Sequence, residues 1–128
     1  MEVPILKQGA YLMATIQSAL SDTDFLKLRD ALVSKVGQYR SRGVILDLTA
    51  VDVMDSFSTR ILRDLSLMIR LRGAEMVVVG IQPEVAFAMV QLNLTLQGVE
   101  TALDLEEGLT FLNGRVRRTA EETRSRGG

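Results

Sequence analysis

The segment at residues 55–60 holds the side chains of this sequence that are best suited to chemistry. It reads Asp-Ser-Phe-Ser-Thr-Arg, which places the hydroxyl groups of Ser56, Ser58 and Thr59 within four consecutive positions. If a helix starts here, its free N–H groups and the positive end of its dipole would stabilise a phosphate on one of these hydroxyls, and the added charge of roughly −1.5 to −2 would reverse the local potential. The alternative is structural: Ser56 caps the helix, while Ser58 and Thr59 fill an exposed first turn.

Catalytic chemistry has few other candidates. The chain contains no histidine and no cysteine, which excludes thiol catalysis and zinc–thiolate sites and removes the commonest general base. Asp47, Asp52 and Asp55 come closest to a carboxylate cluster, which could bind magnesium or transfer protons. Asp47 falls within a predicted strand and the other two in a connecting turn, so turn and capping roles are favoured. With no glycine-rich phosphate loop either, we expect no enzyme, no cofactor and no metal site.

The composition indicates one domain with an aliphatic core. Of the 128 residues, 47% are hydrophobic but only 5% are aromatic, and the net charge is −1. Such a core suits layered α/β architectures, and the mixed charges indicate neither a nucleic-acid groove nor a polybasic membrane surface. No apolar run reaches the ~18 residues of a membrane span. We therefore expect a cytoplasmic location by default.

The elements that position the hydroxyl segment follow from hydrophobic periodicity. Residues 3–6 and 11–16 predict a hairpin, and a helix capped by Ser21 follows and ends near residues 40–43. Residues 44–48 have the aliphatic character of a central strand buried on both faces. A helix then runs from Ser56 to a stop at Gly73, and residues 75–81 form a second buried strand.

The remaining elements complete a mixed sheet. Pro83 suits the first turn of a third helix, residues 100–103 predict a short strand, and Asp104 is placed to cap a last helix. The predicted order is ββαβαβαβα, an α/β fold with helices packed mainly on one face of the sheet. We expect the domain to span residues 1–114 and the arginine-rich stretch 115–128 to be a basic, flexible tail.

The helix that starts at Ser56 has an unusually broad apolar arc. Ile61 and Leu65 lie on one stripe, but Leu62 is about 100° round the cylinder from Ile61, and Ile69 widens the arc further. We expect Leu62 and Ile69 to stay exposed near the hydroxyl segment as part of a partner surface. The alternative is a helix wedged between the sheet and a neighbouring helix.

These residues resemble the STAS family, which comprises domains of sulfate transporters and anti-sigma-factor antagonists. The likeness centres on an Asp-Ser pair, here Asp55 and Ser56, that opens a helix after a buried strand. It is sharpest toward the RsbS-like proteins of the bacterial stressosome, and residues 100–106 give its most specific match. The other matching stretches are residues 3–7, 43–48, 51–57 and 80–83.

The resemblance implies a regulatory phosphorylation site at Ser56, with Asp55 as its acidic neighbour. Ordinary antagonists continue with Ser or Thr and then Gly, whereas this chain has Phe57 and Ser58. That departure favours the stressosome subgroup and leaves Ser58 as a second candidate acceptor, with Thr59 completing the neighbourhood. The acidic residue that many antagonists carry at the start of the first helix is replaced here by Ser21, with Asp22 beside it.

The family further implies a non-enzymatic scaffold. It would self-associate as a dimer and in a large assembly with RsbR-like STAS paralogues, and would sequester an RsbT-like serine/threonine kinase. That kinase would release itself by phosphorylating the scaffold, and a PP2C-type phosphatase would reset the system. Two rivals remain open: a free anti-sigma-factor antagonist that binds an anti-sigma kinase directly, and a nucleotide-binding domain that holds a phosphate at the first turn after Ser56.

Overall fold

The computed structural model describes residues 3–17 and 20–127 and forms five strands and four helices in the predicted order. The elements in chain order are β1 (Ile5–Gln8), β2 (Tyr11–Thr15), α1 (Asp22–Tyr39), β3 (Gly43–Asp47), α2 (Ser56–Leu71), β4 (Glu75–Val79), α3 (Pro83–Gln91), β5 (Glu100–Ala102) and α4 (Leu105–Gly127). The predicted ββαβαβαβα order is therefore confirmed.

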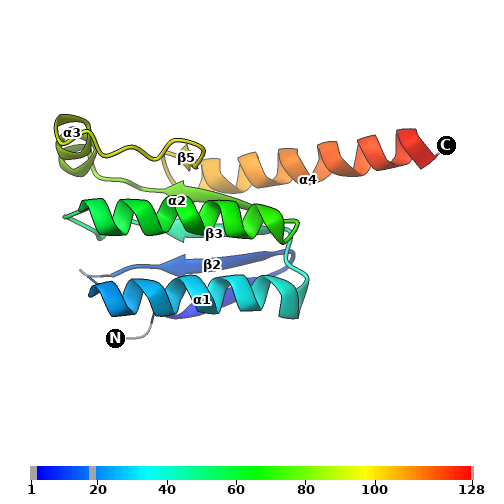
Figure 1. Cartoon of the computed structure of the whole chain (residues 1–128). Coiled ribbons are helices and arrows are strands. Elements are labelled where there is room, and N and C mark those ends of the chain that lie inside the picture. Colours follow the sequence, from blue (N-terminus) through cyan, green and yellow to red (C-terminus); the bar gives the residue numbers. More distant parts are fainter. Residues whose placement is uncertain (1–2, 18–19, 128) are drawn as a thin grey trace.

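The strands form one mixed sheet in the order β1-β2-β3-β4-β5 (Figure 1). Only the β1–β2 pair is antiparallel, and the other three pairs are parallel. The first turn is tighter than predicted, because Gln8 pairs with Tyr11 and only two residues separate the strands. Gly9 adopts a φ of +59° there, a left-handed conformation that suits a two-residue hairpin turn.

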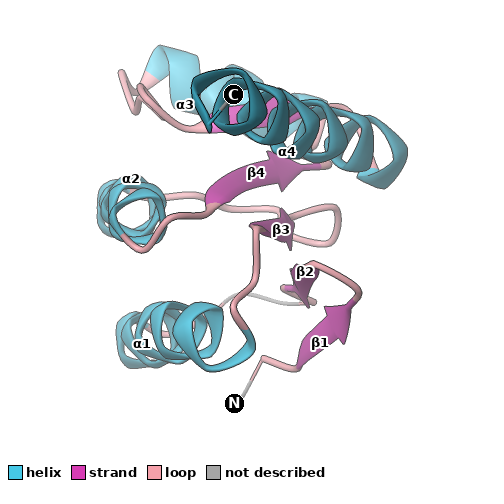
Figure 2. Cartoon of the chain, turned by 90° about the vertical axis from the view of Figure 1, so that its right-hand side faces the viewer, coloured by secondary structure: helices cyan, strands magenta, loops and turns pink. Residues whose placement is uncertain are grey.

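Helices cover both faces of the sheet, with most of them on one side. In Figure 2, α1 and α2 lie against one face and α4 against the other. Strand residues alternate accordingly: Leu46 and Val78 join the larger core cluster with α1 and α2, while Ile45 and Val77 pack with Leu112 of α4. The central strands are thus buried on both sides, as their continuous aliphatic runs predict.

Three of the predicted helix starts are confirmed. Ser21 caps α1, and its Oγ accepts a hydrogen bond from the Asp24 N–H at 3.1 Å. Pro83 occupies the first turn of α3. Asp104 accepts from the Glu107 N–H at 2.9 Å at the start of α4. These caps place the helix starts at the edge of the sheet where the parallel strands end.

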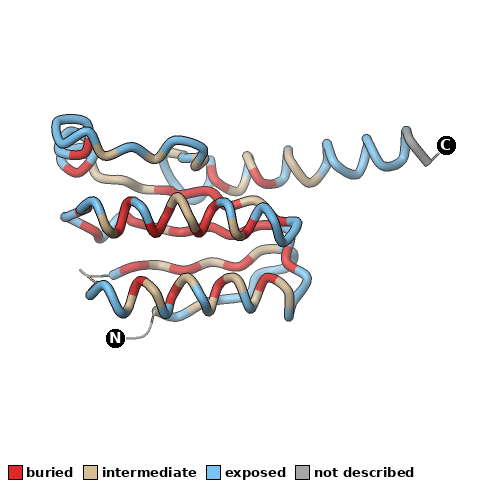
Figure 3. Tube along the Cα trace, viewed as in Figure 1, coloured by how far each residue is buried: buried red, intermediate tan, exposed pale blue. Residues whose placement is uncertain are grey.

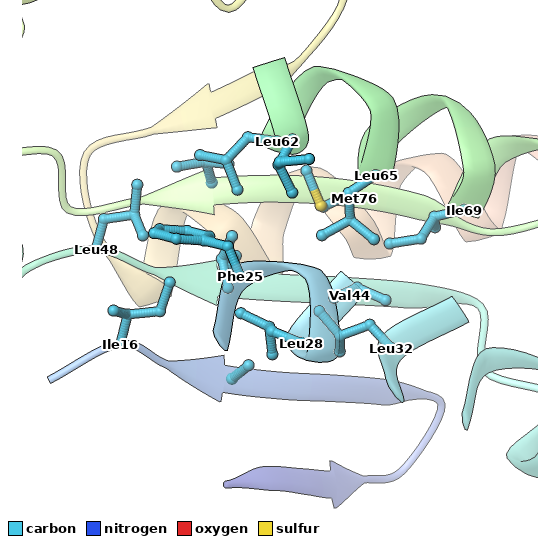
Figure 4. Packing of buried hydrophobic residues seen from close by; sticks show 14 of the residues in the cluster. Ile16, Phe25, Leu28, Leu32, Val44, Leu48, Leu62, Leu65, Ile69 and Met76 are labelled. Atoms are coloured by element: carbon cyan, nitrogen blue, oxygen red, sulfur yellow. The ribbon is translucent and has the colours of Figure 1, made fainter. Parts of the chain in front are cut away.

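The expected exposure of Leu62 and Ile69 is wrong. Both side chains are 0% exposed and lie in the core beside Leu65 (Figure 4). The physical reason is that α2 packs on the sheet and on α1 at once, so its apolar arc faces two surfaces. The exposed apolar residues of this helix are instead Leu67 and Leu71.

Helix α4 continues beyond the predicted boundary at Gly114. It runs unbroken to Gly127 and projects past the end of the sheet (Figure 1), and Figure 3 shows that most of this extension is exposed. The sequence becomes arginine-rich after Gly114, but the helix continues through this point without a break. None of the helices in the described ranges has a stretch long and apolar enough to cross a membrane.

The wedged position of α2 gives a stability prediction. Leu62→Ala leaves a cavity between α2, the sheet and α1 and should lower the free energy of unfolding by about 2–5 kcal/mol. Leu67→Ala is the matched control, since Leu67 is 55% exposed on the same helix, and it should change stability by no more than about 0.5 kcal/mol. Urea denaturation followed by circular dichroism measures both, and equal effects would contradict this packing.

Candidate functional site

The connection from β3 to α2 is tied to the end of β4. Asp47 Oδ1 accepts hydrogen bonds from the Thr49 N–H at 2.9 Å and the Thr49 hydroxyl at 2.6 Å. The Gln82 side-chain amide donates to the Thr49 carbonyl at 2.6 Å. Gly80, with a φ of +78°, lies so close that a Cβ there would be 2.2 Å from Thr49 Oγ1. The first residues of the β3–α2 loop are therefore fixed against the end of β4 by hydrogen bonds and close packing, ahead of the helix start at residue 55.

Asp55, and not Ser56, is the N-cap of α2, which corrects the expected cap. Asp55 Oδ1 accepts a hydrogen bond from the Ser58 N–H at 2.7 Å, while the Asp55 N–H donates to Ser58 Oγ at 3.0 Å. This reciprocal pair is a capping box in which serine takes the place of the usual glutamate or glutamine. The Ser58 hydroxyl also lies 2.9 Å from Asp55 Oδ1, so the same serine can donate to the carboxylate that caps it.

The remaining hydroxyls of the segment differ sharply in exposure. Ser58 is 5% and Thr59 is 2% exposed, so the expectation that they fill an exposed first turn is wrong. Thr59 Oγ1 donates to the Asp55 carbonyl at 2.7 Å. Both hydroxyls lie on the face of α2 that packs against the core. Both also form hydrogen bonds with the backbone of Asp55 in the first turn.

Ser56 is the exposed hydroxyl of the three. It is the first residue of α2, directly after the capping aspartate. Its hydroxyl takes part in no hydrogen bond to any residue in the ranges 3–17 and 20–127. Phe57, its neighbour, is half-buried and packs against the core, which fixes the orientation of the first turn. The structure thus leaves Ser56 accessible to another protein.

A small pocket beside the start of α2 contains two acidic side chains. Asp22 at the start of α1 and Asp55 at the start of α2 line one small pocket of about 90 Å³, together with apolar side chains such as Phe25 and Val51. Hydrogen bonds from the Ser58 N–H and hydroxyl hold the pKa of the Asp55 carboxyl below its usual value. The carboxylate is therefore charged at neutral pH. The sequence placed Asp22 at the start of the first helix, beside the position where many antagonists carry an acidic residue. It gave no sign that Asp22 and Asp55 line one pocket, because only the fold brings the two helix starts together.

The three carboxylates that the sequence suggested as a metal cluster have separate positions in the structure. Asp47 accepts hydrogen bonds from Thr49, Asp55 caps α2, and Asp52 is exposed in the loop. Among the residues that the structure describes, no group of three or more acidic side chains is placed to hold a metal ion. The geometry presents the Ser56 hydroxyl on a surface beside charged side chains.

Comparison with known proteins identifies the family. Residues 3–108 match the family model described as the STAS domain. The chain therefore belongs to the STAS domain family, and the resemblance seen in its motifs is confirmed. The structure of SpoIIAA, an anti-sigma-factor antagonist in its unphosphorylated form, has a TM-score of 0.65 at 12% identity; this likeness concerns the fold alone.

Three relatives are more similar in sequence. A serine-to-glutamate variant of RsbS from Moorella thermoacetica is 33% identical with a TM-score of 0.76, and the alignment covers 90% of this chain and 97% of that one. A structure described as the molecular architecture of the stressosome, a signal integration and transduction hub, is 32% identical with a TM-score of 0.71, covering 89% and 99%. RsbRA of Bacillus subtilis (strain 168), named an RsbT co-antagonist protein, is 34% identical over 89 residues. That match covers 69% of this chain but only 32% of RsbRA.

The reciprocal cap predicts a pH-dependent contribution to stability. Because the pKa of Asp55 is lower in the folded protein than the ordinary aspartate value of about 3.9, its stabilisation is present above that value and is lost as the pH falls through the folded-state pKa. Asp55→Ala should cost about 0.5–2 kcal/mol at pH 7, and the difference from the parent should shrink toward pH 3.

Asp55→Asn tests how much of the stabilisation by residue 55 comes from the charge of its carboxylate and how much from the capping hydrogen bond. Asparagine still accepts a hydrogen bond as an N-cap but has no carboxylate to titrate. This variant should recover most of the loss at pH 7 without the acid dependence that residue 55 contributes. Thermal unfolding across the pH range measures both effects, and a constant Asp55→Ala deficit down to pH 3 would rule out a role for the ionised carboxylate.

Proposed function

We propose that this STAS domain protein is a non-catalytic scaffold of a stressosome-type assembly, switched by phosphorylation of Ser56. In this proposal it co-assembles with RsbR-like STAS proteins, binds an RsbT-like serine/threonine kinase and releases that kinase when phosphorylated by it. A PP2C-type phosphatase removes the phosphate. The observation that carries the proposal is the hydroxyl of Ser56 directly after the capping Asp55: it is exposed, and no residue in the described part of the chain bonds to it.

The relatives support this assignment. An RsbS variant and a stressosome structure each match nearly the whole of this chain at about one-third identity. The third relative is named as a co-antagonist of RsbT, which favours an RsbT-like kinase as the partner. The match to the RsbS variant covers 97% of that protein, which favours the role of the RsbS-type component.

The position of Ser56 suits a switch that leaves the fold intact. A phosphate at the first residue of a helix is stabilised by the free N–H groups and the dipole of that helix. It would add roughly −1.5 to −2 charges to a surface that already carries Asp22, Asp52 and Asp55. A partner that binds this surface would then meet a changed charge and a more strongly hydrated group, and its affinity would fall.

Ser58 remains the second candidate acceptor, but its use would require a local opening. Its hydroxyl is buried and bonded to Asp55, so a kinase could reach it only after the capping box breaks. Losing a cap costs about 0.5–2 kcal/mol, a free energy low enough for the helix start to open transiently. Ser56 needs no such step, and we therefore assign it as the first site.

The nucleotide-binding alternative finds little support in this geometry. The pocket beside the start of α2 has a volume of about 90 Å³, whereas ligand pockets usually have about 300–1,000 Å³. Two carboxylates, Asp22 and Asp55, line it, and they would repel a nucleotide's phosphates.

The acceptor assignment can be tested with an RsbT-type kinase. Ser56→Ala should abolish phosphate incorporation, because it removes the accessible hydroxyl, while leaving the Asp55–Ser58 cap in place. Ser58→Ala is the matched control and should still be phosphorylated, although its helix start is weaker. Mass spectrometry of tryptic peptides locates the phosphate. Retention of one phosphate in Ser56→Ala and its loss in Ser58→Ala would move the site to Ser58.

Assembly provides a separate test. Mixed with an RsbR-like paralogue, the chain should elute from size-exclusion chromatography in a complex much larger than either protein alone. Ser56→Asp should assemble in the same way but retain less kinase. A chain that ignores the paralogue and binds an anti-sigma kinase as a monomer would instead identify the free antagonist.

A further inference from the structure

A second polar feature lies at the other end of α2. Ser56 opens this helix and Arg70 lies in its last turn, so the two ends are about 20 Å apart at a rise of 1.5 Å per residue. At the Arg70 end, a cleft of about 210 Å³ separates the end of α2 and the start of β4 from the middle of α4. This is the region of Figure 1 where α4 begins to project past the sheet.

The cleft is rich in guanidinium groups. Its charged lining consists of Arg42, Arg70, Arg115, Arg118, Glu75 and Glu122. Arginine stays protonated at every physiological pH, so four fixed positive charges face two carboxylates. A neighbouring groove shares Arg42 and adds Arg40 and Arg72, which extends the positive surface around this end of the molecule.

Two of the four cleft arginines are held in place by partners. Arg70 donates from Nη2 to the Gly98 carbonyl at 3.1 Å. Arg115 lies 3.8 Å from Glu100 Oε1, and its guanidinium stands over the Phe111 ring at 5.4 Å from the centroid. These contacts use only part of each five-donor guanidinium and limit the ordering that a bound anion would require.

The side chains of the other two arginines are not held in this way. Among the residues that the structure describes, the guanidinium groups of Arg42 and Arg118 make no hydrogen bond and no ion pair, and Arg42 bonds to Ala10 and Glu75 through its backbone alone. Burial raises the pKa of the Tyr11 phenol, and the charge of Arg42 partly offsets that rise. Arg70 is explained as a basic residue that complements the negative end of the α2 dipole. That explanation does not extend to Arg42, which precedes a strand, or to Arg118, which lies in the interior of α4. The fold thus places two guanidinium groups across one cleft, and neither forms an ion pair with a carboxylate in the described part of the chain.

The shape and charge of the cleft indicate the class of ligand. Guanidinium groups bind phosphate oxygens through paired N–H donors. A volume of about 210 Å³ falls below the usual range for drug-sized ligands and suits a phosphate on a small organic group. Glu75 and Glu122 can accept hydrogen bonds from such a group, while they would repel a long polyanion.

We propose that the arginine cleft between α2, β4 and α4 binds a small phosphorylated molecule. Bound phosphate would bridge Arg42 on the sheet side to Arg118 on the helix and so fix the projecting part of α4 against the domain. The site is distinct from Ser56 and does not depend on the function proposed for that residue.

The test is an NMR titration of the full chain with inorganic phosphate and with glycerol 3-phosphate, against sodium chloride at matched ionic strength. Amide signals of Gly73, Glu75 and Thr119 should shift and saturate with both phosphates, while that of Phe57 at the switch end should not move. Amide hydrogen exchange in the α4 extension should slow in the presence of glycerol 3-phosphate.

Arginine variants distinguish a specific phosphate site from non-specific attraction of phosphate to a positively charged surface. Arg42→Gln combined with Arg118→Gln should weaken binding about tenfold or more, since two charged donors are removed. Arg117→Gln, a neighbour on α4 outside the cleft, should change the affinity by less than about twofold, because it makes no contact with the bound phosphate. Equal weakening by Arg117→Gln, the absence of saturable shifts, or binding of a short oligouridylate without binding of either phosphate would overturn the proposal.

Discussion

Strands β3 and β4 are buried on both faces, and this burial dictates where the helices must lie. Parallel strands that are apolar on both sides must be covered by helices on both sides, and here α1 and α2 cover one face while α4 covers the other. Each helix that follows a strand runs back along the sheet, so its first turn lies where the strands end. The starts of α1 and α2 therefore share one edge, and the end of α2 meets α4 at the opposite edge.

Within that frame, one reciprocal cap determines which hydroxyl groups of the segment are bonded and which one is exposed. Asp55 and Ser58 satisfy each other and two backbone N–H groups, which a helix start needs in any case. Thr59 is used in the same turn. Ser56, between the two capping residues, is required by neither and stays exposed. The Asp55–Ser58 cap therefore does not depend on the Ser56 hydroxyl.

The two ends of α2 differ in charge as well as in role. Around Ser56 the surface carries aspartates, whereas the far end gathers arginines from α2, α4 and the start of β3. A net charge of −1 conceals this separation, because it sums opposite charges that lie far apart in space. Electrostatic recognition depends on the local field, so the two surfaces can select different partners while the chain as a whole is nearly neutral.

Local signals in the sequence were enough to predict the element order, the caps of α1 and α4, the place of Pro83 in the first turn of α3 and the family. These signals are hydrophobic periodicity, capping residues and the Asp55–Ser56 motif. The sequence placed a hydroxyl cluster at a helix start but could not say which hydroxyl is free. That choice depended on the direction in which α2 packs, which buries Ser58 and Thr59. The same packing buried Leu62 and Ile69, since only the tertiary structure sets α1 beside α2. The arginine cleft likewise exists only in the fold, where residues separated by more than 70 positions in the chain, such as Arg42 and Arg118, approach one another.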